Sequence, residues 1–69
     1  MTQNESILAY LRRGWTITPL EALRMFGCFR LGARIYELRR KGVQIDRELV
    51  QTAGGARVAR YKLGGVAHG

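Results

Sequence analysis

The sequence predicts a small α+β domain in which three helices precede a two-stranded β-hairpin. Three sets of apolar residues recur at helical spacing, and residue types that cap helices lie at their ends. From residue 43 onward the apolar period falls towards two, which is typical of strands. We therefore expect one domain over residues 1–63, followed by a flexible glycine-rich tail at residues 64–69.

The first predicted helix begins close to the N-terminus. Thr2 and Glu5 have the spacing of a capping box, and Asn4 is a competing cap. Its inward stripe consists of Ile7, Leu8 and Leu11. The helix is expected to end at Gly14. Residues 15–17 alternate apolar and polar and are rich in aromatic and β-branched types, which predicts a short strand with Trp15 as an anchor in the core or at the sheet edge.

The second predicted helix has the clearest start signal in the chain. Thr18 can cap it, Pro19 suits the first helical position because it has no N–H to satisfy, and Glu21 completes a capping box. The residues expected to face the core are Leu20, Leu23 and Phe26. Gly27 should end this helix, and residues 27–29 should form a tight link to the third helix, as in a helix-turn-helix unit.

The third predicted helix spans about residues 29–41. Its buried stripe is expected to consist of Leu31, Ile35 and Leu38. Basic residues crowd its last turn before Gly42, where they suit the negative end of the helix dipole. The residues expected to point away from the core are Phe29, Arg30, Ala33, Tyr36, Glu37 and Arg40, with Arg34 on the flank. Outward arginines match phosphates and guanine edges, so this helix is the candidate DNA-recognition element.

Residues 43–63 predict the hairpin. A three-residue loop at 53–55, with Gly55 at positive φ, opposes Glu48 to Arg60 and Asp46 to Lys62 on the solvent face. The other face then carries Ile45, Leu49, Ala59, Tyr61 and Leu63. A two-residue turn would mix apolar and charged residues on each face, so we favour the three-residue loop.

The charge and composition of the chain favour some classes of function and exclude others. Ten arginines and two lysines oppose five acidic residues, and the net charge of +7 favours a polyanionic partner. The lone Cys28 is expected to be a small buried hydrophobe, and the lone His68 lies in the predicted tail, so neither a catalytic pair nor a cofactor or metal site is predicted. No apolar run is long enough for a membrane span, and no signal peptide is evident, which predicts a cytoplasmic, non-enzymatic protein.

The chain resembles the small winged helix-turn-helix proteins that are common in phages and prophages. The residues that carry the resemblance are Ile17-Thr18-Pro19-Leu20-Glu21-Ala22, Phe26-Gly27, Arg30-Leu31, Ala33-Arg34-Ile35, Leu38-Arg39, Lys41-Gly42 and Ile45. The resemblance extends over residues 2 to about 63. It implies DNA binding, usually in a regulatory role, in a nucleoid-associated protein of a bacterial or phage-infected cell.

This reading places the third helix in the major groove and the 43–63 hairpin, as a wing, on the DNA backbone. The predicted DNA-binding residues are Arg30, Ala33, Arg34, Tyr36, Glu37, Arg40, Arg57 and Arg60. Double-stranded DNA is the expected partner, with a homodimer on repeated half-sites as the expected assembly and no small-molecule substrate. Structural alternatives remain open: an Arg34–Glu21 pair, a Glu37–Lys41 pair, and Tyr36 covering the core edge.

Two partners other than duplex DNA are compatible with the sequence. A protein-interaction module would use the outer face of the third helix, with Phe29 and Tyr36 as anchors. RNA binding is the third option, although the assignment of Tyr61 to the inward face leaves no aromatic sheet surface for single strands.

Overall fold

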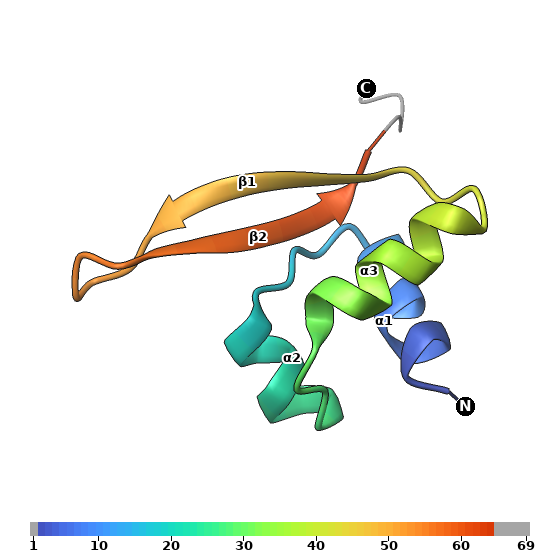
Figure 1. Cartoon of the computed structure of the whole chain (residues 1–69), viewed down its shortest axis with the longest axis horizontal. Helices are drawn as coiled ribbons and strands as arrows, with labels where there is room; N and C mark the ends of the chain where they lie inside the picture. The colour runs from blue at the N-terminus through green and yellow to red at the C-terminus, as the bar shows by residue number, and fades with distance from the viewer. Residues whose placement is uncertain (1, 65–69) are drawn as a thin grey trace.

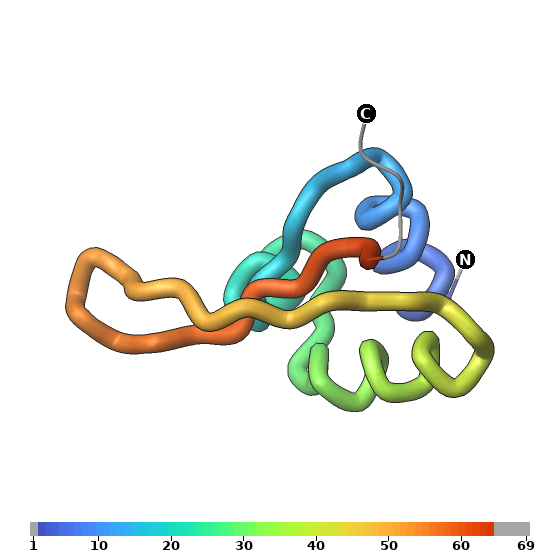
Figure 2. Tube along the Cα trace, turned by 90° about the horizontal axis from the view of Figure 1, so that it is seen from above, coloured from blue at the N-terminus to red at the C-terminus, as the bar shows by residue number. Residues whose placement is uncertain are grey.

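The computed structural model describes residues 2–64; Met1 and the predicted tail residues 65–69 lie outside this range. The elements, in chain order, are α1 (Gln3–Arg12), α2 (Pro19–Phe26), α3 (Leu31–Arg40), β1 (Ile45–Gln51) and β2 (Arg57–Leu63). The helices form one cluster, and the hairpin runs across it with its tip projecting beyond the helices (Figure 1). Seen from above, the half of β1 nearest the helices lies between β2 and α3 (Figure 2). The predicted order of three helices and a hairpin is confirmed.

Capping boxes begin the first two helices, as predicted. The Thr2 hydroxyl accepts from the Glu5 backbone N–H at 3.1 Å, while Thr2 N–H donates to the Glu5 carboxylate at 2.8 Å. Thr18 and Glu21 make the same two bonds, at 3.3 and 2.9 Å. Such caps satisfy backbone donors that the first helical turn leaves unpaired.

The link between α2 and α3 comprises residues 27–30, so α3 begins two residues later than the predicted start at residue 29. Gly27 has φ of +64°, and its N–H donates to Leu23 O at 3.0 Å, which ends α2 with a left-handed residue. The Gln3 side-chain amide donates to the carbonyls of Phe26 and Gly27, each at 3.3 Å. The start of α1 therefore holds the end of α2 in place.

The core lies between the three helices and the base of the hairpin. Its buried members are Ile7, Leu11, Ile17, Ala22, Cys28, Leu31, Ile35, Leu38, Ile45 and Tyr61. The predicted stripe of α3 is confirmed, since all three of its apolar residues are at most 3% exposed. Cys28, at 2% exposure, is the small buried hydrophobe that the sequence predicted.

The segment after α1 departs from its prediction. Instead of a strand over residues 15–17, Ile17 alone forms a bridge, exchanging two backbone hydrogen bonds with Tyr61 at 2.8 and 2.9 Å. Trp15 is 48% exposed and not a core anchor, because Leu11 and Ile17 occupy the core on either side of it. Its ring lies 4.8 Å from the Tyr10 ring, and the Arg13 guanidinium stacks on it at 5.3 Å.

The predicted inward face of α2 is also wrong in part. Leu20 and Leu23 are 55% and 38% exposed, and the buried residue is Ala22. The helix meets the core through Ala22 and the partly buried Phe26, which lie one turn apart. This orientation turns Leu20 and Leu23 towards the hairpin tip, where they share a hollow with β1 and β2.

The predicted hairpin register is confirmed. Glu48 pairs with Arg60 and Asp46 with Lys62, and Thr52 N–H donates to Ala56 O at 2.8 Å across a loop in which Gly55 has φ of +85°. The loop therefore has three residues, 53–55.

The burial of the two hairpin faces changes along the ribbon. Near the helices Ile45 and Tyr61 reach the core, but Leu49, on the same face by strand alternation, is 56% exposed. Two-stranded ribbons twist strongly, so near the tip the opposite face, with Val50 and Val58, turns towards α2. The prediction that Leu49 faces the core was wrong for this reason.

Candidate nucleic-acid interface

The outer face of α3 is opposite the buried residues Leu31, Ile35 and Leu38. Tyr36 is 61% exposed, Arg40 one turn after it is exposed, and Ala33 one turn before it is half-buried. The Arg40 guanidinium carbon lies 5.9 Å from the centroid of the Tyr36 ring. The exposure of Tyr36 contradicts the alternative in which it covers the core edge. A small residue beside an exposed aromatic and a cation permits close approach to a partner.

Arg30 precedes the first residue of α3 and is exposed. Its carbonyl accepts from the N–H groups of Ala33 and Arg34 at 3.1 and 3.2 Å, so its backbone is fixed by the helix. Within residues 2–64 no carboxylate pairs with its guanidinium. The backbone of Arg30 is therefore fixed, while its cationic side chain is exposed to solvent.

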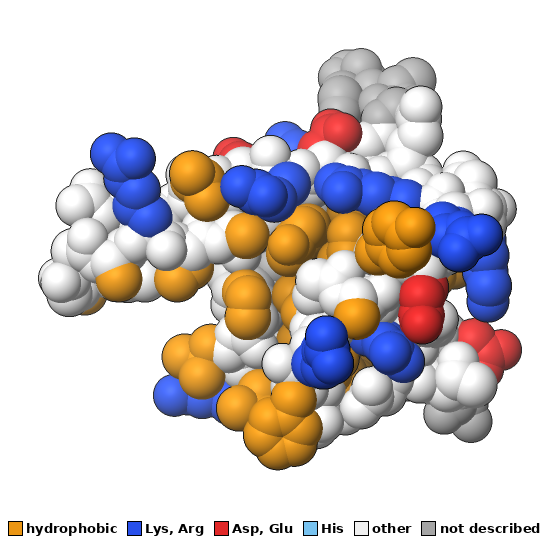
Figure 3. Space-filling view, in the orientation of Figure 1, with side chains coloured by type: hydrophobic (Ala, Val, Ile, Leu, Met, Phe, Trp, Pro, Cys, Tyr) orange, Lys and Arg blue, Asp and Glu red, His pale blue; other side chains and the backbone are white. Residues whose placement is uncertain are grey.

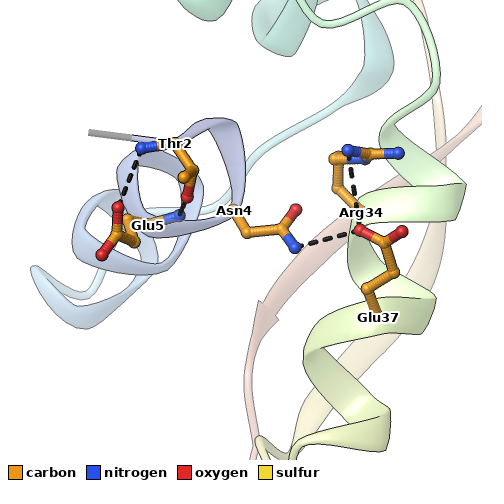
Figure 4. A network of polar contacts seen from close by, with 5 residues as sticks. All are labelled: Thr2, Asn4, Glu5, Arg34 and Glu37. Carbon is orange, nitrogen blue, oxygen red and sulfur yellow. Dashed lines mark hydrogen bonds and ion pairs between the residues drawn. The ribbon is translucent and has the colours of Figure 1, made fainter.

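A polar network joins α1 to α3 on one flank of this face (Figure 4). The Asn4 side-chain amide donates to Glu37 Oε1 at 3.0 Å, and Arg34 Nη1 lies 3.6 Å from the same oxygen. The alternatives of an Arg34–Glu21 pair and a Glu37–Lys41 pair are therefore both wrong. Asn4 draws the Glu37 carboxylate towards α1 and Arg34, whereas Lys41 lies beyond the last turn of α3.

Arg34 and Glu37 remain accessible despite this contact. Their side chains are 32% and 44% exposed, and an ion pair at 3.6 Å with that exposure is weak. Arg34 is the more restricted of the two predicted arginines near the start of α3, since Arg30 has no such neighbour among the described residues.

Arg39 has a structural contact that the sequence did not indicate. Its Nε and Nη2 both donate to the carbonyl of Ile45, at 3.1 and 2.7 Å. This forked contact fixes the end of α3 against the first residue of β1, and so it sets the position of the hairpin relative to α3.

The hairpin carries three arginines, of which two are exposed and one is hydrogen-bonded to a carboxylate. Arg57 is exposed at the start of β2, and by register and alternation Arg47 shares its face. Arg60 donates through Nε and Nη2 to Glu48 Oε2 at 3.0 and 2.7 Å, as its predicted register position allows. These hydrogen bonds and the Arg60 charge hold the pKa of the Glu48 carboxyl below its ordinary value.

Arg47 was missed by sequence reasoning. The confirmed register places it opposite Tyr61, on the face that we expected to be inward, yet it is exposed. The ribbon twist that exposes Leu49 is the physical reason. The sequence did contain a sign of this exposure, because the charged Arg47 lies between Ile45 and Leu49 among the alternate positions that we expected to face inward.

The face of the molecule drawn in Figure 3 carries basic side chains over both α3 and the hairpin. This surface, together with three helices and a hairpin, has the layout of a winged helix-turn-helix, and the family model of the winged helix-turn-helix domain matches residues 2–66. The chain belongs to this family. Winged helix-turn-helix domains are typically non-enzymatic DNA-binding modules, so membership indicates DNA binding in general.

The remaining comparisons add no relative. Neither the search of curated proteins nor the search of solved structures returned a match. Within residues 2–64, none of the helices has the length and apolar character needed to cross a lipid bilayer.

Proposed function

We propose that this winged helix-turn-helix domain binds duplex DNA with α3 in the major groove and the β1–β2 hairpin on the sugar-phosphate backbone. The observation that carries the proposal is the outer face of α3. Arg30 and Arg40 lie on it with no carboxylate partner among residues 2–64, and the basic hairpin continues the same surface in Figure 3.

Each residue of α3 takes a role from its position. Arg30, at the N-terminal end that enters the groove first, contacts a base edge or the nearest phosphate. Ala33 allows the helix to approach closely, and Arg34 contacts DNA only by leaving its weak pair with Glu37. Tyr36 and Arg40, further along the helix, contact phosphates. Glu37 accepts a hydrogen bond from a cytosine amino group.

The wing contributes mainly through Arg57 and Arg47, which are both exposed and lie on the same face of the hairpin by register. Arg60 contributes less, because its guanidinium donates two hydrogen bonds to Glu48. The glycine-containing tip lets the backbone of the wing come close to DNA.

The proposed biological role is regulation of transcription or of phage growth, in the cytoplasm of a bacterial or phage-infected cell. One small module covers little DNA surface, so a homodimer on repeated half-sites is the proposed assembly.

The test is a titration of labelled mixed-sequence duplex at several salt concentrations. If about five phosphates are neutralised, the log-log slope of affinity against salt should be about -4 to -5. The matched control is Arg12→Ala, which removes an exposed arginine from the end of α1 and should leave the slope unchanged. An affinity that does not depend on salt would contradict the proposal.

A further inference from the structure

An apolar hollow lies between α2 and the hairpin tip, beside the start of α3. It has a volume of about 510 Å³, and the apolar side chains that shape it are Leu20, Leu23, Phe29, Val50 and Val58. We call it the α2–wing groove. Phe29 is 86% exposed and Leu20 is 55% exposed. In Figure 3 apolar side chains line the hollow between the projecting hairpin and the helices below it.

Neither the fold nor DNA binding accounts for this groove. The core is complete without Leu20 and Phe29, which it leaves in contact with water. A phosphate backbone offers no apolar groups to cover them. Single exposed leucines are ordinary, but a contiguous apolar surface with a polar rim marks an interaction site.

The surroundings of the α2–wing groove are positively charged. Arg24 lies one helical turn after Leu20, and Arg30 directly follows Phe29; both are exposed. Neither pairs with a carboxylate among residues 2–64, and the nearby Glu21 carboxylate accepts the capping bond from Thr18 N–H. Figure 3 shows basic side chains above, below and beside the hollow. A complementary ligand therefore combines an apolar stripe with carboxylates.

We propose that the α2–wing groove binds an acidic amphipathic helix of a partner protein, and that this helix competes with DNA for Arg30. An amphipathic helix places apolar side chains at i, i+3, i+4 and i+7 into a groove and its acidic residues against the basic rim. The competition with DNA rests on the proposed function, because it requires Arg30 to contact DNA.

A second copy of the chain fits the groove less well. The chain has a net charge of +7, so two copies bring basic rims together. Within residues 2–64, α1 and α3 bury their apolar stripes, and the exposed leucines of α2 are followed by Arg24. The one acid beside the exposed leucines of α2 is Glu21, and its carboxylate accepts the capping bond from Thr18 N–H.

The test starts with a displayed library of helical peptides about four turns long, randomised on all faces and selected on the whole protein. Counter-selection uses the Leu20→Ser/Leu23→Ser variant. The matched control is Met25→Ser, which changes an exposed apolar residue of α2 that does not line the groove. The enriched peptides should carry acidic residues beside an apolar stripe. They should bind the wild type and Met25→Ser equally, and the double variant at least about tenfold more weakly.

Three outcomes would overturn the groove assignment. They are an absence of enriched peptides, enrichment of peptides without acidic residues, and a dimer in sedimentation that Leu20→Ser/Leu23→Ser dissociates. Both leucines are exposed, so the double variant should fold; circular dichroism checks this, and Leu20→Ser alone replaces it if it does not.

Competition is measured by adding the selected peptide to the labelled duplex titration. The apparent Kd for DNA should rise in proportion to peptide concentration. An unchanged Kd would overturn the competition while leaving the groove assignment intact. The same titration without peptide reports DNA binding alone, so failure of the proposed function is distinguishable from failure of this inference.

Discussion

Helices α2 and α3 are neighbours in the chain and in space, but they present opposite kinds of surface. Helix α3 buries three apolar residues and exposes arginines and Tyr36, whereas α2 buries Ala22 and exposes Leu20 and Leu23. The outer face of α3 suits a polyanion, and that of α2 suits an apolar partner. Phe29 and Arg30, in the link between the helices, lie where the two surfaces meet. The difference indicates two kinds of contact on one small domain.

The largest expected effect is on the free energy of unfolding, which should fall much more for a substitution in α3 than for one in α2. Ile35→Ala should lower the free energy of unfolding by about 2 to 5 kcal/mol, because it leaves a cavity in the core. Leu20→Ala should cost less than about 1 kcal/mol, because that side chain is half-exposed. Urea denaturation measures both. If Ile35→Ala does not fold, Ile35→Val should still cost about 0.5 to 1.5 kcal/mol. Equal losses at the two positions would remove the contrast between α2 and α3.

The next effect concerns DNA specificity. Arg30→Ala should weaken binding to the preferred site by about 1 to 3 kcal/mol and relax the preference at one base pair. Arg24→Ala, on α2, should leave base preference unchanged. Selection of bound sequences from random duplexes provides the readout. An unaltered preference in Arg30→Ala would assign that residue to phosphate alone.

A smaller effect is expected from the wing. Arg57→Ala should weaken binding to all sequences alike and reduce the magnitude of the salt slope by about one. Arg60→Ala should change the slope less, since Arg60 is held by Glu48. Titrations of both variants at matched salt concentrations measure this difference. The reverse order would show that Arg60 leaves its ion pair when DNA binds.

The parts of the fold that sequence could predict depend on local signals. Thr18 and Glu21 lie three residues apart in one helical turn, and Gly55 fixes the loop that sets the hairpin register. The stripe of α3 was predictable because it lies on a helix that packs with one face against the core.

The errors arose where the burial of a residue depends on how elements dock. The apolar residues of α2 correctly predicted a helix, but the contact through Ala22 decided which face was buried. Ribbon twist likewise exposed Leu49 and Arg47.

For the candidate site, the sequence could predict which residue types lie on α3 and the hairpin, but not which of them contact one another. The Asn4–Glu37 bond joins residues 33 positions apart, so no local pattern could reveal it. The DNA contacts of the eight predicted residues stay predictions, and the experiments above test those of Arg30, Arg57 and Arg60.

The smallest expected effect is a dependence of the free energy of unfolding on pH, which arises from one carboxyl on α1 and one on β1. Hydrogen bonds from the Thr2 backbone and from Arg60 hold the pKa values of Glu5 and Glu48, respectively, below the ordinary value of 4.5. A carboxyl whose pKa is lower in the folded state stabilises the fold above its unfolded pKa, and this contribution is lost as pH falls through the folded pKa. The free energy of unfolding should therefore decline from about pH 5 downwards. Urea denaturation across this range should show a shallower decline in Glu5→Gln/Glu48→Gln than in the wild type. An identical decline in the wild type and the double variant would show that these two carboxyls are not the source of the acid sensitivity.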